Sequence, residues 1–141
     1  MSILSNYQHR FLIQEQLQEI GLDAANIILE PAARNTAAAA CIAALMAGQS
    51  DPSTLVLLAP SDHAVENNDS FAETIKLGAV SARQGALVTF GVVPDCPHTG
   101  YGYIEAGEGL SRANGPVAVK RFVEKPSREV TETYLESGCF Y

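Results

Sequence analysis

The sequence predicts an α/β fold in which helices cover a mainly parallel sheet. Short apolar runs alternate along the chain with helical patterns of about ten to fifteen residues, which is typical of βαβ units. Two of these runs, residues 54–59 (TLVLLA) and 86–93 (ALVTFGVV), are continuously apolar, as expected of strands that are covered on both faces. Glycines follow most of the helical patterns and supply stop signals.

In the first half of the chain, Ile3 and Leu4 are expected to end a strand. Asn6 can then cap a helix that runs to residue 20 and stops at Gly21. Residues 27–29 form the next predicted strand. An alanine-dominated, buried helix follows over residues 36–48 and is closed by Gly48, and a turn then leads into the strand at residues 54–59.

In the second half, the capping-box spacing of Ser70 and Glu73 predicts a helix to about residue 84, which Gly85 ends. The strand at residues 86–93 comes next, and Pro94 begins a long polar loop. Residues 103–106 and 117–124 are expected to be strands. A final helix should begin at Pro126 and Ser127, run through residue 135 and end at Gly138.

Length and charge narrow the class of protein. The chain has 141 residues, enough for one domain with a single core, and its 9 Lys and Arg against 16 Asp and Glu give a net charge of −7. An acidic chain without a basic cluster argues against nucleic-acid binding. No apolar stretch approaches the ~20 residues that span a bilayer, and the start lacks the features of a signal peptide. We therefore expect a cytoplasmic protein without a membrane partner.

The cysteines argue against a disulfide framework. Cys41, Cys96 and Cys139 are odd in number, widely spaced and without a CxxC pair, so reduced thiols are expected and a structural zinc site is not. His63 and His98 have no second histidine or carboxylate at zinc-ligand spacing, and neither is predicted to bind a metal.

Ligands of parallel α/β sheets bind beyond the carboxyl ends of the strands. Four segments follow predicted strands and are therefore the candidate site: residues 30–36, 60–63, 94–103 and 124–126. Asp62 could bind Mg²⁺, which prefers one or two carboxylates together with substrate phosphates, or it could merely cap a turn.

Each of the other segments likewise allows both a ligand-binding and a purely structural interpretation. Asn35 or Thr36 could present free helix N–H groups to an anion, or serve as a plain N-cap. The glycines beside Tyr101 allow a ligand close to the backbone, or simply form a turn. Glu124 and Lys125 would point to opposite faces of a strand unless the strand ends there, as Pro126 indicates.

Taken together, the ordered segments resemble the bacterial mannose-1-phosphate guanylyltransferases, also called GDP-mannose pyrophosphorylases. The segments that carry the resemblance are HRF at 9–11, LEP at 29–31, RNTA at 34–37, PSDH at 60–63, TFG at 89–91, TGYGYIE at 99–105 and FVEKP at 122–126. They span the whole chain. The resemblance implies a Rossmann-like nucleotidyltransferase domain that transfers GMP from GTP to mannose 1-phosphate with Mg²⁺, giving GDP-mannose and pyrophosphate.

The resemblance also implies roles for individual residues. Asp62 corresponds to a catalytic magnesium ligand, and Lys125 to a catalytic residue near the sugar phosphate. The remaining matches are substrate-binding positions: Glu30, Arg34, Asn35 and Thr36 on the nucleotide side, and Gly100, Tyr101, Gly102 and Glu124 on the sugar side.

The chain departs from the family pattern in ways that bear on activity. The glycine-rich loop GGxGxRLxPLS with its PKQ, expected before Ile3, and the WNSGMF segment, expected after Tyr141, are not among these residues. Ala38 stands where the family usually has Pro, and His98 where it commonly has Glu. We therefore expect residues 1–141 to be one partial nucleotidyltransferase domain, truncated at both ends and inactive alone.

Two alternatives to this interpretation stay open. One is a nucleotidyltransferase of the same fold for another nucleoside triphosphate or another sugar 1-phosphate. The other is a truncated, non-catalytic module that self-associates. Because truncation would leave strands of the sheet unpaired, the 141-residue chain is expected to form a homo-oligomer.

Overall fold

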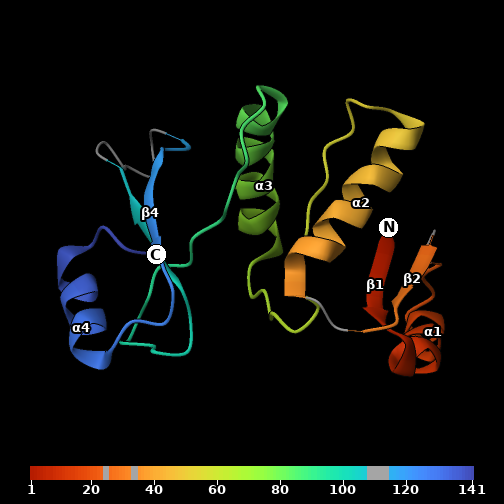
Figure 1. The fold of residues 1–141 in the computed structure, drawn as a ribbon, viewed down its shortest axis with the longest axis horizontal. Helices are drawn as coiled ribbons and strands as arrows, with labels where there is room; N and C mark the ends of the chain where they lie inside the picture. Colours follow the sequence, from red (N-terminus) through yellow and green to blue (C-terminus); the bar gives the residue numbers. More distant parts are fainter. Residues whose placement is uncertain (24–25, 33–34, 108–114) are drawn as a thin grey trace. The chain divides into compact units, whose positions relative to one another are not determined.

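The computed structural model of the chain describes residues 1–23, 26–32, 35–107 and 115–141. It divides into two compact units, Met1–Asp62 and His63–Tyr141. The first contains β1 (Ser2–Asn6), the short 3₁₀ helix η1 (Tyr7–His9), α1 (Arg10–Glu19), β2 (Asn26–Glu30) and α2 (Asn35–Ser50) (Figure 1). The second contains α3 (Asn68–Arg83), β3 (Tyr103–Ala106), β4 (Val119–Val123) and α4 (Arg128–Ser137).

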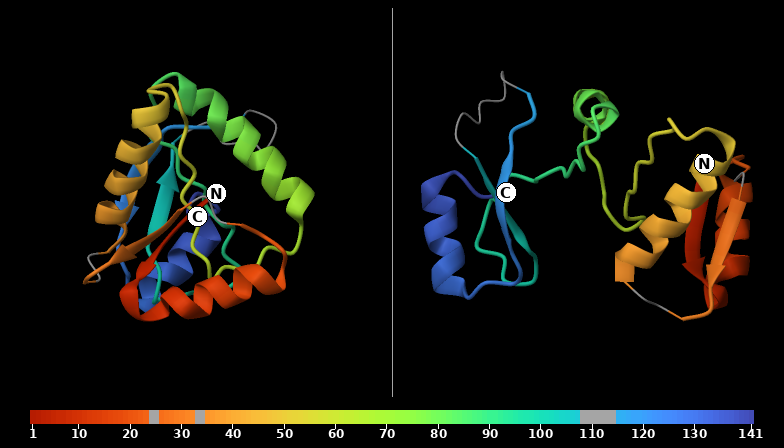
Figure 2. Two further views of the ribbon diagram at one scale, coloured as in Figure 1. Left: turned by 90° about the vertical axis from the view of Figure 1, so that its right-hand side faces the viewer. Right: turned by 45° about the horizontal axis from the view of Figure 1, so that its top comes forward.

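The first unit begins with the βαβ arrangement that the sequence predicts. β1 and β2 pair in parallel from Ser2↔Asn26 to Asn6↔Glu30, and η1 and α1 form the crossover between them (Figure 2). The Asn6 side chain accepts a hydrogen bond from the backbone N–H of Gln8 at 3.0 Å, so it caps η1. Gly21 follows α1 with a φ of +66°, a conformation that glycine adopts without strain. The α/β class and its parallel sheet are confirmed.

The alanine-rich helix is longer and more exposed than predicted. α2 continues through Gly48 to Ser50, because one glycine in a helix costs only ~1 kcal/mol. The helix ends before Asp51, whose carboxylate accepts hydrogen bonds from the N–H and the hydroxyl of Ser53 at 2.8 and 2.7 Å and so forms a turn. No residue of α2 is buried in this structure, so the prediction of a buried helix is wrong.

Two predicted strands are not strands in the structure. Residues 54–59 and 86–93 follow irregular paths, and the side chains of Leu55, Val56, Leu57 and Leu58 are 39–49% exposed. A strand exists only where a neighbouring strand accepts its hydrogen bonds, and apolar sequence does not supply that neighbour.

The second unit is built around β3. β3 pairs antiparallel with β4, starting at Tyr103↔Val123. Along β3 also run the last residues of the chain, where Ile104 and Tyr141 exchange N–H···O=C hydrogen bonds of 2.7 and 3.0 Å. The strand predicted at residues 103–106 is confirmed with its bounds, and β4 is slightly shorter than predicted.

The helices of the second unit end as predicted, but α3 begins differently. The side chain of Asn67 accepts a hydrogen bond from the N–H of Ser70 at 2.9 Å, so α3 starts at Asn68 rather than at Ser70. Gly138 ends α4 with a φ of +64°. Within the described residues, no helix has the length and apolar character needed to cross a membrane.

Three aromatic side chains form the core of the second unit. Tyr103, Tyr134 and Phe140 are 3%, 8% and 7% exposed. The rings of Tyr134 and Phe140 stack with their centroids 3.6 Å apart, and Tyr103 meets Tyr134 edge to face at 5.6 Å. These contacts join β3, α4 and the last residues of the chain, and Val123 at the end of β4 packs against the cluster.

A buried carboxylate ties β3 to β4. Glu105, only 8% exposed, accepts hydrogen bonds from Lys120 Nζ at 2.6 Å and from Arg121 Nε. The Lys120 ammonium and the Arg121 guanidinium hold the pKa of Glu105 below its usual range. The ionised form of Glu105 is therefore the form that stabilises the fold.

Replacing Glu105 with glutamine is expected to lower the thermal midpoint at pH 7 by several degrees. Because the folded pKa is lowered, the contribution of Glu105 is present above its unfolded pKa and is lost as the pH falls through the folded pKa. The difference between parent and variant should therefore shrink below about pH 4. Thermal unfolding followed by circular dichroism at several pH values measures this.

The control is E132Q, which removes an exposed ion pair with Arg128 at 3.1 Å, and its thermal midpoint should differ little from that of the parent at any pH. An equal loss for E105Q at pH 7 and in acid would contradict the prediction.

Candidate functional site

On the predicted nucleotide side, the structure describes three of the four residues. Glu30 is the last residue of β2 and is half-buried, while Asn35 and Thr36 are exposed at the start of α2. Arg34 lies outside the described residues. Asn35 has a φ of +59°, in the left-handed region that asparagine tolerates better than most residues. The first N–H groups of α2 have no acceptor within the helix and can bind an anion.

Asp62 is exposed in the turn that follows residues 54–59. One exposed carboxylate is the kind of ligand that Mg²⁺ combines with water and phosphate oxygens. In the part of the chain that the structure describes, Asp62 is not grouped with two further metal-binding side chains.

On the predicted sugar side, the structure brings Gly102, Glu124 and Lys125 together. Gly102 and Glu124 directly flank the Tyr103↔Val123 pair at one end of the β3–β4 ladder. A Cβ at position 102 would lie 2.7 Å from Cε1 of Phe122 and 3.2 Å from Oε2 of Glu124. A side chain at this position would force the exposed Phe122 ring to shift. At Gly100 a Cβ would meet open space.

Lys125 has an unusual backbone conformation. Its φ is +42°, although it precedes a proline and carries a Cβ. β4 ends at Val123, so the strand stops before the two charged residues, as Pro126 indicates. Neighbouring side chains therefore need not point to opposite faces here, and Lys125 Nζ lies 3.7 Å from Glu124 Oε1. Among the described residues, the non-glycine residues with positive φ are Asn35 and Lys125, and both are predicted site residues. Such conformations cluster at functional sites.

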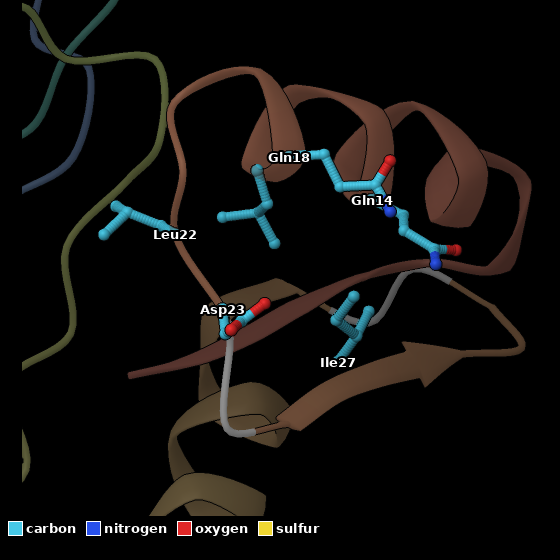
Figure 3. Close-up of a pocket in the computed structure, with 6 residues that line it drawn as sticks. Gln14, Gln18, Leu22, Asp23 and Ile27 are labelled. Carbon is cyan, nitrogen blue, oxygen red and sulfur yellow. The ribbon is translucent and has the colours of Figure 1, made fainter.

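A separate hollow lies in the first unit. It has a volume of about 290 Å³ and is lined by side chains of α1, of β2 and of the segment between them: Gln14, Leu17, Gln18, Leu22, Asp23 and Ile27 (Figure 3). Leu17 forms its buried wall. None of the predicted site residues lines this hollow, and it does not contribute to the candidate site.

Sequence reasoning missed one cluster of polar side chains. Asp95 Oδ1 lies 3.5 Å from His98 Nε2, and Cys96 Sγ lies 3.1 Å from the same nitrogen. The conclusion that His98 has no carboxylate at ligand spacing is therefore wrong. The signal was the i,i+3 spacing of Asp95 and His98 with a cysteine between them. A hydrogen bond from the Cys96 thiol helps to lower the pKa of the Asp95 carboxyl.

Comparison with known proteins assigns the chain to a family. The model of the family described as nucleotidyl transferase matches residues 1–141. A mannose-1-phosphate guanylyltransferase from Klebsiella pneumoniae is 46% identical over 140 residues, which cover 99% of this chain and 30% of that protein. The xanthan biosynthesis protein XanB from Xanthomonas campestris pv. campestris (strain B100) is 45% identical over 139 residues, covering 99% of this chain and 29% of that protein.

Two solved structures share the fold. The crystal structure of mannose-6-phosphate isomerase from Helicobacter pylori is 38% identical with a TM-score of 0.83, over 99% of this chain and 51% of that one. The crystal structure of mannose-1-phosphate geranyltransferase from Thermus thermophilus is 28% identical with a TM-score of 0.79, over 99% and 38%. The chain spans about 30% of the length of the Klebsiella guanylyltransferase and of the Xanthomonas protein XanB. Since the family model matches it from the first residue to the last, the chain belongs to the nucleotidyl transferase family.

Proposed function

We propose that the chain forms part of an enzyme that transfers GMP from GTP to mannose 1-phosphate, giving GDP-mannose and pyrophosphate. The observation that carries this proposal is the 46% identity to the Klebsiella guanylyltransferase over 99% of the chain. The 141 residues would form one partial nucleotidyltransferase domain. Three free cysteines favour a reducing compartment, and we therefore also propose that the protein works in the cytoplasm.

The reaction requires positioning and charge stabilisation rather than a covalent enzyme intermediate. A phosphate oxygen of mannose 1-phosphate attacks the α-phosphorus of GTP, the new O–P bond forms, and the bond to pyrophosphate breaks. Asp62 would hold Mg²⁺, which supplies charge neutralisation between the phosphates. That neutralisation matters in a chain whose net charge is −7, because the protein itself repels anions.

The nucleotide side would be formed by residues around the start of α2. In this proposal Glu30, Arg34, Asn35 and Thr36 bind the nucleotide. The exposed N–H groups of the first turn of α2 would hydrogen-bond its polar edge or a phosphate oxygen. The support is the match to the RNTA motif, together with the left-handed Asn35 at the first residue of the helix.

The sugar side would be formed by the end of the β3–β4 ladder. Gly100, Tyr101 and Gly102 would bring the backbone close to the sugar, and the Glu124 carboxylate would accept hydrogen bonds from sugar hydroxyls. The ammonium of Lys125 would pair with the sugar phosphate. Lys125 Nζ lies 3.7 Å from Glu124 Oε1, so the hydrogen-bond acceptor for the sugar and the cation for its phosphate would lie side by side. This spacing supports the proposed roles of the two residues.

Substrate profiling tests the proposal. Pyrophosphate release is measured in an enzyme that carries the whole domain with these residues, using GTP, ATP, UTP and CTP against several sugar 1-phosphates. We expect GTP with mannose 1-phosphate to be the fastest pair. A different fastest pair would favour the alternative of another nucleoside triphosphate or another sugar 1-phosphate. The 141-residue chain alone contains no GGxGxRL segment and should release none, so turnover in the ordinary range of ~1–10³ per second would contradict its expected inactivity.

A second, non-catalytic role is favoured by one observation. The apolar side chains of residues 55–58 are 39–49% exposed, and no strand pairs with this segment in the described part of the chain. We propose that copies of the chain associate through such segments, forming a homo-oligomer. Light scattering over a dilution series measures this, and a monomer at every concentration would contradict it.

A further inference from the structure

We propose that Asp95, Cys96 and His98 form a binding site for a zinc ion, separate from the magnesium ligand of the transfer reaction. The carboxylate, thiol and imidazole each offer one ligand atom, and these atoms all lie within 4.8 Å of one another. They come from one short loop, so a single local segment supplies three ligands. All three residues are exposed and accessible to an ion from solvent.

The two distances from His98 Nε2 to the other ligand atoms are close to those around a tetrahedral zinc ion. With Zn–S of about 2.3 Å and Zn–N and Zn–O of about 2.0–2.2 Å, tetrahedral ligands lie about 3.4–3.6 Å apart. In the structure, Cys96 Sγ and His98 Nε2 are 3.1 Å apart, and His98 Nε2 and Asp95 Oδ1 are 3.5 Å apart. Movements of a few tenths of an ångström would bring these two pairs to tetrahedral spacing.

The loop is attached to the core of the second unit at the position of the histidine. The backbone N–H of His98 donates to the hydroxyl of Tyr103 at 3.1 Å, and Tyr103 is a buried core residue. The same N–H contacts the carbonyl oxygen of Cys96 at 3.0 Å, and the ring of Tyr101 meets the imidazole edge to face at 5.4 Å. His98 is thus held in place before any ion binds.

The kind of donor selects the metal. A thiolate and an imidazole favour zinc and similar borderline-soft ions, whereas Mg²⁺ prefers oxygen ligands only. On binding, the Cys96 thiol loses its proton to solvent, the neutral imidazole supplies Nε2, and the carboxylate supplies one oxygen. Three protein ligands leave a fourth position for water. An ion here would also restrain the turn that leads into Gly100 and Tyr101.

Cobalt substitution tests this site directly. Co²⁺ is titrated into the reduced 141-residue chain, and the near-ultraviolet charge-transfer band of a cobalt–thiolate bond is recorded. We expect one Co²⁺ per chain, with a band that Zn²⁺ displaces and excess Mg²⁺ does not. C96S should abolish the band, and H98Q should weaken Co²⁺ binding at least tenfold.

The chain offers matched controls, because its three cysteines are all free and exposed. C41S and C139S should both keep the band and the affinity of the parent. Far-ultraviolet circular dichroism of C96S and H98Q should match that of the parent, as expected for changes in an exposed loop. Absence of the band in the parent, or its retention in C96S, would overturn the proposal. Equal affinity of the parent and H98Q would do the same.

Discussion

Asparagine in place of Asp62 is expected to slow GMP transfer about 100-fold or more in an enzyme that carries the whole domain. The amide keeps the size of the side chain and one oxygen, but it removes the charge that would hold Mg²⁺ against the phosphates. Because Asp62 is exposed, the free energy of unfolding should change by less than about 0.5 kcal/mol. Initial rates of pyrophosphate release over a range of Mg²⁺ concentrations measure the effect.

The control for Asp62 is D23N, which removes an exposed carboxylate elsewhere in the same unit. It should leave both the rate and its dependence on Mg²⁺ unchanged. Full activity of D62N at an unchanged Mg²⁺ dependence would show that Asp62 is only a turn residue.

Alanine at position 134 is expected to lower the free energy of unfolding by about 3–5 kcal/mol. The Tyr134 ring stacks on Phe140 and touches Tyr103, so its removal opens a cavity in the only aromatic cluster found among the buried described residues. Urea unfolding followed by circular dichroism gives the change from the midpoint and slope.

Val130, on the same helix α4 but 38% exposed, provides the comparison. V130A should cost about 1 kcal/mol or less, since a partly exposed side chain leaves little cavity behind. Similar losses for the two variants would mean that the aromatic cluster does not hold the second unit together.

Local signals in the sequence predicted the elements whose causes are local. Gly138 ends α4 and Pro126 marks the end of β4, because both residues act through their own backbone conformations. The start of α3 was missed because Asn67 and Ser70 are both good capping residues, and only the observed hydrogen bond distinguishes them. The strands expected at residues 54–59 and 86–93 depend on distant partners, about which hydrophobicity says nothing.

The candidate site shows the same division. The closeness of Gly102, Glu124 and Lys125 could be anticipated from the strand end, whereas the contact of Phe122 with Gly102 depends on side-chain packing. The Asp95, Cys96 and His98 cluster was missed because the expected zinc spacings are those of CxxC pairs. The roles of the site residues stay predictions.

At Lys125, the backbone conformation favours glycine, whereas the proposed chemistry requires a lysine side chain. A side chain with a Cβ in this conformation costs about 1 kcal/mol or more, and glycine would remove that cost. Glycine would also remove the ammonium proposed to meet the sugar phosphate. A search for stabilising substitutions would therefore favour, at this residue, the change that the proposed chemistry tolerates least.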